Sequence, residues 1–379
     1  MPYDIPHTVS PGLWALAWRR LRGDRVAMIS LAIVALFLLL IALSAAGLVA
    51  KDWSREVGVN YAPPTFVGPD AANLPNTAAG ATSIAPDAVE NEVDREIPDP
   101  LADALAAIRA GATKPGEAPP GVAADKESVD PLADVMADIK AKEGGRADAT
   151  VVRAATLPLG GDKWGRDVLK KTIKGSETSI LVGIAAAIVA VALGSVFGAI
   201  AGYYGRWLDD LFNWFYSVFT AIPYLLLILA VAAVLQQKGT LTIILILGLT
   251  GWTGVFRLIR GEYLKHKGRE YVQAADAIGA SNARRMFVHI LPNVSHVVLV
   301  QLSILTVAFI KSEVILSFLG FGVPVDVVSW GSMLNEAQNE LILGKWWQLA
   351  AAGTAMALLV TAFSLFTDAL RDALDPKLK

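Results

Sequence analysis

The chain has 379 residues, of which 54% are hydrophobic and 18% are charged, with a formal net charge of −2 and no cysteine. Its mean hydropathy of +0.48 is higher than that of ordinary soluble domains, which must cover much of their surface with polar groups. The lack of cysteine excludes disulfides, thiolate metal sites and cysteine nucleophiles.

Charge is divided unevenly along the chain. Residues 51–160 carry 10 basic and 18 acidic side chains, a net charge of −8, so the other residues carry a net charge of +6. The basic excess lies in short segments beside apolar stretches. That placement is typical of the loops that orient a membrane protein and not of a nucleic-acid-binding surface.

Six apolar stretches approach or exceed the 20 or so residues that a membrane-spanning helix needs. The first is longer than the apolar region of a signal peptide, and Pro223 is predicted to kink the third. The sequence therefore predicts an all-α integral membrane protein whose spans occupy residues 26–50, 180–201, 214–235, 241–258, 294–320 and 346–366.

Lys and Arg cluster before the first span, between the fourth and fifth spans, and after the sixth. Because short cytoplasmic loops are enriched in these residues, we expect both termini in the cytoplasm, with residues 1–25 as the N-terminal cytoplasmic segment. A basic group on the predicted outer side goes against this pattern and comprises Lys163, Arg166, Lys170, Lys171 and Lys174.

Residues 51–160 are predicted to be an acidic insertion on the outer side, largely loose because their composition buries little apolar surface. Residues 99–109 and 130–140 are similar to each other, and both begin with Asp-Pro, which favours two short amphipathic helices. Whether they form a spacer or a docking element stays open. Residues 161–379 then hold the other five spans.

The cytoplasmic loop at residues 262–292 is predicted to form a helical elbow. Residues 262–278 have helical periodicity, Gly279 suits a left-handed cap, and Ser281 suits the start of a second helix that Pro292 ends. Ala274 and Ala275 would let a partner's backbone approach closely. Periodicity alone equally allows an ordinary amphipathic helix on the membrane surface.

A family resemblance rests on this loop. The run Gln273-Ala-Ala-Asp276, Gly279 and the later Leu291-Pro292 resemble the coupling-loop signature of binding-protein-dependent ABC importer permeases. Gln273 stands where the family often has Glu, and His289 where many members have Ile. Further similar stretches indicate the second permease subunit of the dipeptide/oligopeptide (and nickel) branch; they lie at residues 161–168, 175–183, 202–205, 221–223, 316–322, 329–331 and 368–376.

The resemblance implies a six-span type I permease in a bacterial inner membrane that forms a path for peptides. It implies a second permease subunit, two cytoplasmic ATPases that hold ATP and magnesium, and an external substrate-binding protein. The insertion at residues 51–160 departs from the family's short loop. The residues that the resemblance implies for ATPase coupling are Gln273, Ala274, Ala275, Asp276, Gly279, Ala280, Ser281, Leu291 and Pro292.

This chain is not expected to be an enzyme or to bind a cofactor. It contains no Walker A run, Gly-x-x-x-x-Gly-Lys-Ser/Thr, which cradles the phosphates of ATP. Its four histidines have no metal-ligand spacing. Trp330, Trp346 and Trp347 are predicted to lie in an interfacial aromatic belt.

Two charges, Lys311 and Glu313, lie in the predicted fifth span. Charges at that depth face a bundle interior or a water-filled path, so each either lines a cavity or bonds to a neighbouring helix or subunit. Two positions apart on a helix, they do not face each other.

Two other functions stay open. An ion-coupled secondary transporter usually has several ionisable groups at mid-membrane and inverted repeats, which this sequence lacks. A membrane scaffold or sensor would use the acidic insertion as its ligand domain, but that segment has few aromatic residues to form a pocket.

Overall fold

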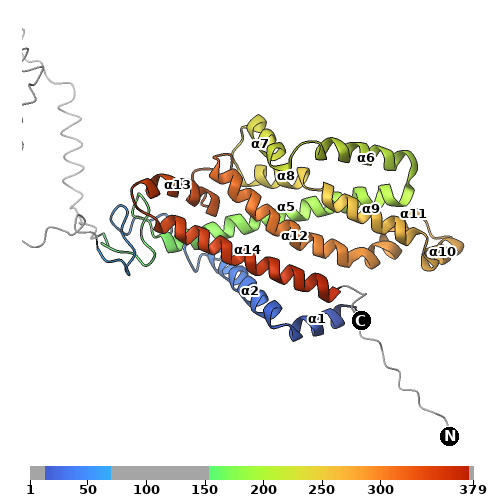
Figure 1. The fold of residues 1–379 in the computed structure, drawn as a ribbon, viewed down its shortest axis with the longest axis horizontal. Coiled ribbons are helices and arrows are strands. Elements are labelled where there is room, and N and C mark those ends of the chain that lie inside the picture. The colour runs from blue at the N-terminus through green and yellow to red at the C-terminus, as the bar shows by residue number, and fades with distance from the viewer. Residues whose placement is uncertain (1–12, 70–152, 375–379) are drawn as a thin grey trace, which may run out of the picture. The chain divides into compact units, whose positions relative to one another are not determined.

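The structure, a computed structural model, describes residues 13–69 and 153–374, and the regular secondary structure in this part is helical (Figure 1). The two amphipathic helices expected at residues 99–109 and 130–140 lie outside the described residues. The helices are α1 (Leu13–Gly23), α2 (Arg25–Ala45), α5 (Val168–Tyr204), α6 (Arg206–Thr220), α7 (Tyr224–Leu235), α8 (Thr240–Thr250), α9 (Thr253–Lys267), α10 (Glu270–Ala277), α11 (Asn282–Arg284), the π-helix η3 (Arg285–Ile290), α12 (Leu291–Phe318), α13 (Trp330–Ile342) and α14 (Trp347–Leu374).

Within the described ranges, four helical stretches are long and apolar enough to cross a membrane, and two bent helix pairs bring the number to six. The four stretches are α2, α5, α14 and the continuous run from α11 through α12. The pairs are α6 with α7 and α8 with α9. The prediction of an all-α protein is confirmed, with four to six candidate apolar spans in the described residues.

Helix α5 is the central element, with 37 residues and a length of about 55 Å. The side chain of Asp167 caps its first turn, so it begins twelve residues before the predicted span. Gly194, Gly198 and Gly202 recur every fourth residue and face α9, where a methyl group on Gly198 would lie 2.8 Å from the Phe256 carbonyl oxygen. Small residues at this spacing let two membrane helices pack backbone to backbone.

The third predicted span is not one kinked helix. Helices α6 and α7 meet at an angle of 84°, and Pro223 stands at the start of α7. Proline has no backbone N–H and its ring clashes with the preceding turn, so it breaks the helix here. Helix α7 has 12 residues, about 18 Å, so only the pair is long enough to cross a bilayer.

The fourth predicted span is also broken, by 42° between α8 and α9. Gly251 lies at the break, and a methyl group there would sit 2.3 Å from the Phe309 ring. Helix α9 then continues to Lys267, past the predicted end of the span. At the bend, the lack of a side chain on Gly251 lets the Phe309 ring of α12 pack against the backbone.

The two ends of the predicted insertion are ordered and pack against each other and against the residues before α5. Isolated bridges join Glu56 to Arg166 and Gly58 to Ala154, and Pro64 pairs with Leu157. Gly165 makes close packing possible here, because a side chain would collide with the Gly58 carbonyl. The predicted domain boundaries stay a prediction, but residues 51–69 and 153–160 are packed together at the N-terminal end of α5.

Candidate functional site

The elbow has the cap that the sequence predicts. Gly279 has φ +82°, the left-handed conformation that ends α10. The Ala280 N–H donates to the Ala275 carbonyl at 3.0 Å, and the Gly279 N–H donates to the Asp276 carbonyl at 2.8 Å. The Ser281 hydroxyl accepts from the Arg284 N–H and begins α11. This bonding fixes the direction in which the chain turns.

The helix before the bend is shorter than predicted, which corrects the continuous helix at residues 262–278. Helix α9 ends at Lys267 and α10 begins at Glu270, with Gly268 at the junction. Glycine lowers helix stability, and Gln273 replaces a missing helical bond by donating its side-chain amide to the Gly268 carbonyl at 3.3 Å. A glutamate at position 273 has no N–H with which to make this bond.

Pro292 does not end the second helix, contrary to the prediction. The chain passes from α11 through η3 into α12 without a break, and Pro292 lies in the first turn of α12. The wide π-turn of η3 accommodates the residue that lacks an N–H, and the Asn293 side chain donates to the His289 carbonyl at 2.7 Å. The elbow is thus rigidly continuous with a membrane span.

Polar bonds tie the elbow to the bundle and to itself. The Tyr203 hydroxyl, at the end of α5, donates to the Asn282 side chain at 3.1 Å, and the Tyr263 hydroxyl of α9 donates to the Met286 carbonyl at 3.1 Å. Within the elbow, Arg285 forms an ion pair with Asp276 at 2.5 Å. These bonds link α10 and the residues after the bend to α5 and α9.

The predicted coupling residues divide by exposure. Ala275 is 4% exposed and packs into the chain, whereas Ala274, Gly279 and Ser281 are exposed. The sequence reasoning missed Ile278, which is 84% exposed at the tip of the bend. Of the others, Gln273, Asp276 and Pro292 are exposed, while Ala280 and Leu291 are half-buried.

The two charges of α12 lie in different environments. Glu313 is fully buried, and the Ser317 hydroxyl donates to its Oε1 at 2.7 Å. The hydroxyls of Ser179 and Ser329 lie beside the same carboxyl group. Lys311 is exposed and makes no hydrogen bond or ion pair with any residue that the structure describes. Glu313 thus packs between helices, and Lys311 faces outward from this chain.

The profile of the binding-protein-dependent transport system inner membrane component family matches residues 194–379, which include the elbow, and the profile of the N-terminal transmembrane domain of oligopeptide transport permease C matches residues 12–64. The dipeptide transport system permease protein DppC of Bacillus subtilis is 38% identical over 221 residues, 58% of this chain and 69% of that protein. The chain belongs to this permease family.

Other relatives agree. The oligopeptide transport system permease protein OppC of Bacillus subtilis is 36% identical over 221 residues, 58% of this chain and 72% of the relative. The protein of the same name from Haemophilus influenzae is 35% identical over 219 residues, 58% of this chain and 70% of the relative. With its apolar spans, the permease is a multi-pass protein of the bacterial inner membrane.

The permease also contains a buried ionic cluster that the sequence did not predict, here called the outer anchor after the side of the membrane on which the distribution of Lys and Arg predicts it. The Lys171 ammonium, 1% exposed, bonds to Asp162 at 2.8 Å and to Glu336 at 2.5 Å. Gln348 of α14 accepts from the same ammonium at 3.3 Å. These groups join the segment before α5 to α13 and α14. The sequence did contain a signal for this cluster. The basic group before the second span includes Lys171, which is buried against two carboxylates.

Glu340 lies at the edge of the outer anchor. Its Oε1 accepts from the Lys163 N–H at 3.3 Å, whereas its Oε2 is buried without a hydrogen bond. Burial, helped by the neighbouring carboxylates of Asp162 and Glu336, raises the pKa of Glu340 to about 7 against the lowering effect of Lys171. Within the described residues no group of His, Cys, Asp or Glu is arranged to hold a metal ion.

Two tryptophans correct the predicted aromatic belt. Trp330 is fully buried and donates its indole N–H to the Thr172 carbonyl at 3.1 Å. Trp347 is 5% exposed and donates to the Gly161 carbonyl at 2.7 Å. Both fasten α13 and α14 to the start of α5, and of the three predicted residues only Trp346 is substantially exposed, at 43%.

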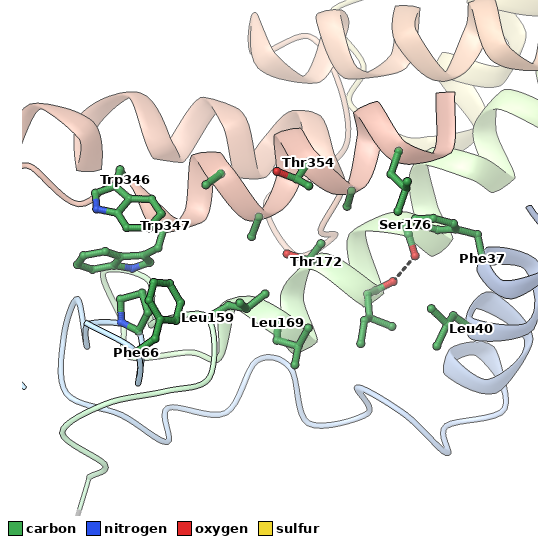
Figure 2. Close-up of a pocket in the computed structure, with 16 residues that line it drawn as sticks. Phe37, Leu40, Phe66, Leu159, Leu169, Thr172, Ser176, Trp346, Trp347 and Thr354 are labelled. Carbon is green, nitrogen blue, oxygen red and sulfur yellow. Dashed lines mark hydrogen bonds between the residues drawn. The ribbon is translucent and has the colours of Figure 1, made fainter. Parts of the chain in front are cut away.

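An apolar cavity of about 400 Å³ lies between α2, α5 and α14 (Figure 2). Phe66, Trp346 and Trp347 stand at one end and Phe37 with Leu40 at the other, as Figure 2 shows. The Ser176 hydroxyl in its wall is already bonded to a backbone carbonyl, that of Ile173, at 2.6 Å. Such walls suit hydrocarbon and offer almost no partner for a peptide backbone.

Proposed function

We propose that this permease forms half of the path through which an ATP-driven importer takes up peptides. The observation that carries the proposal is the elbow centred on Gly279, exposed at its tip and continuous with α12, in a chain of this family. Its relatives are named dipeptide and oligopeptide transport permeases, which supports peptides as cargo.

The partners follow from the chemistry that this chain lacks. Its sequence has no phosphate-binding Walker A loop, so ATP and magnesium belong to separate cytoplasmic ATPases. A second permease subunit completes the path, and an external protein delivers the peptide. In this arrangement both termini and the elbow face the cytoplasm, as the distribution of Lys and Arg indicates.

The elbow supplies the mechanical step. An ATPase cleft that encloses Ile278 moves α10 when the ATPases close, and the continuous η3–α12 helix carries this motion into the membrane. The Tyr203–Asn282 and Tyr263–Met286 bonds move α5 and α9 with it. Reorientation of these spans opens the path to alternate sides.

The test is ATP-dependent peptide uptake by proteoliposomes that contain both permeases and the ATPases, with loaded binding protein outside. Ile278→Asp should reduce uptake at least about tenfold, because a charge in an apolar protein contact costs more than 1.4 kcal/mol. The matched control is Val325→Asp, at a site 98% exposed in the loop between α12 and α13, which should leave uptake unchanged.

Two results would contradict the proposal. Uptake that Ile278→Asp leaves unaltered would show that the bend is not where the ATPases act. Failure of the complete wild-type assembly to import any peptide would reject peptides as the cargo.

A further inference from the structure

Lys311 is a charge far from either end of a span, and no residue that the structure describes serves as its counter-ion. It lies on α12, exposed, with no hydrogen bond or ion pair to any described residue. Glu313 does not neutralise it, because that carboxyl group is fully buried and bonded to Ser317. An uncompensated ammonium in contact with lipid tails is costly, so this side of α12 faces water or another polar group.

The geometry of α12 argues against escape of the charge to the membrane surface. Lys311 lies seven residues before Phe318, the end of the helix, which is a distance of about 10 Å. Side chains on an α-helix tilt toward the helix N-terminus, so Lys311 leans away from this nearer end. The other end, at Leu291, is about 30 Å away and beyond the reach of a lysine side chain.

Hydroxyl groups lie at the depth of Lys311 on the buried side of α12. Its neighbour in sequence, Ser312, lies with Thr250 of α8 beside the hydroxyl of Tyr224 from α7. Three helices thus bring hydroxyl groups to the depth of Lys311. Ile304 and Leu319, each about two turns from Lys311 in opposite directions, are apolar and exposed, so the charge is a single cationic point between them.

We propose that Lys311 lines the translocation path and binds the carboxylate of the passing cargo. This inference rests on the proposed peptide import, because the C-terminal carboxylate is a group that linear peptides share. Lysine suits a moving ligand, since a point charge on a flexible stem accepts a carboxylate from many directions. A fixed pair between two subunits would instead favour the planar fork of arginine.

The test compares trialanine with trialanine amide, which differ by one carboxylate, in proteoliposomes that hold the complete transporter and saturating, preloaded binding protein. Lys311→Met should lower the ratio of acid to amide uptake rates about tenfold, the usual effect of losing a charge-assisted hydrogen bond. Lys311→Arg should keep most of the preference. Lys238→Met, an exposed lysine between α7 and α8, is the matched control and should not change the ratio.

Three outcomes would overturn the inference. One is an assembled Lys311→Met transporter with the wild-type ratio. Another is loss of the second permease subunit from both Lys311→Met and Lys311→Gln, which would assign the charge to an ion pair between subunits. The third is a wild-type transporter that imports neither probe. This result would reject the proposed function itself, and the wild-type measurement alone reveals it.

Discussion

The two ends of α5 are held in opposite ways. At its N-terminal end, the outer anchor buries an ammonium between two carboxylates, and two tryptophans are fastened to backbone carbonyls. At its C-terminal end, the elbow leaves Ile278 exposed and depends on a partly exposed ion pair and two tyrosine hydrogen bonds. One end is thus fixed by buried contacts, whereas the other leaves an apolar tip exposed, which suits the partner contact proposed above.

The comparison predicts its largest effect on stability at the outer anchor. Lys171→Met leaves Asp162 and Glu336 without their buried counter-ion and should lower the free energy of unfolding by about 3–5 kcal/mol. The measurement is denaturant unfolding in detergent. The adjacent Lys170→Met removes only an exposed pair with Asp52 and should cost less than about 1 kcal/mol; equal losses for the two variants would refute the distinction.

A second prediction concerns pH at the same end. The pKa of Glu340 is about 7 in the folded chain and 4.5 for an unperturbed glutamate carboxyl, so between these values the folded state holds a proton that the unfolded state has released. Stability should therefore fall as pH rises from about 5 to about 7. Thermal unfolding of the wild type and of Glu340→Gln over this range measures the effect, and an equal slope in both proteins would contradict it.

A third prediction tests the packing between the two ends. Gly198→Ala places a methyl group 2.8 Å from the Phe256 carbonyl oxygen and should destabilise the protein by about 1–3 kcal/mol. Gly261→Ala lies in α9 with no neighbour within 4 Å and should stabilise the protein by up to about 1 kcal/mol. The measurement is the free energy of unfolding of both variants. A change of the same sign in both would mean that α5 and α9 are not in close contact at Gly198.

The smallest effect on stability is expected at the elbow. Asp276→Asn removes a pair whose aspartate side chain is 63% exposed and should change the free energy of unfolding by less than about 1 kcal/mol. It should nevertheless lower the amount of peptide imported per ATP hydrolysed, because α10 loses its tie to Arg285. The free energy of unfolding and the ratio of peptide imported to ATP hydrolysed are measured on the same variant. A large loss of stability would contradict the expected difference between the two ends of α5.

Local signals in the sequence predicted the elements that depend on neighbouring residues. Gly279 as a left-handed cap, Ser281 as a helix start and the apolar spans all follow from patterns within a few residues. The sequence predicted the position of the bend at Pro223. It did not predict the angle of 84°, because that angle depends on what α6 and α7 pack against.

The features that the sequence did not predict depend on distant partners or on unusual turns. Lys171 meets Glu336, which lies 165 positions away, and no periodicity links the two. Pro292 predicts a helix end because proline disfavours α-helix interiors, but the π-turn before it removes this conflict. The exposure of Ile278, set against the burial of Ala275, likewise required the packed bundle.

The central claim is that the exposed bend meets an ATPase in the cytoplasm. Because the chain has no native cysteine, Ile278→Cys and Val325→Cys are each single-cysteine proteins, and both sites are highly exposed. A thiol crosslinker applied to membranes that contain the whole transporter should join the Ile278→Cys permease to an ATPase subunit and leave Val325→Cys unattached to one. An ATPase crosslink at Val325→Cys, or labelling of Ile278→Cys by a membrane-impermeant thiol reagent from outside the cell, would contradict the account.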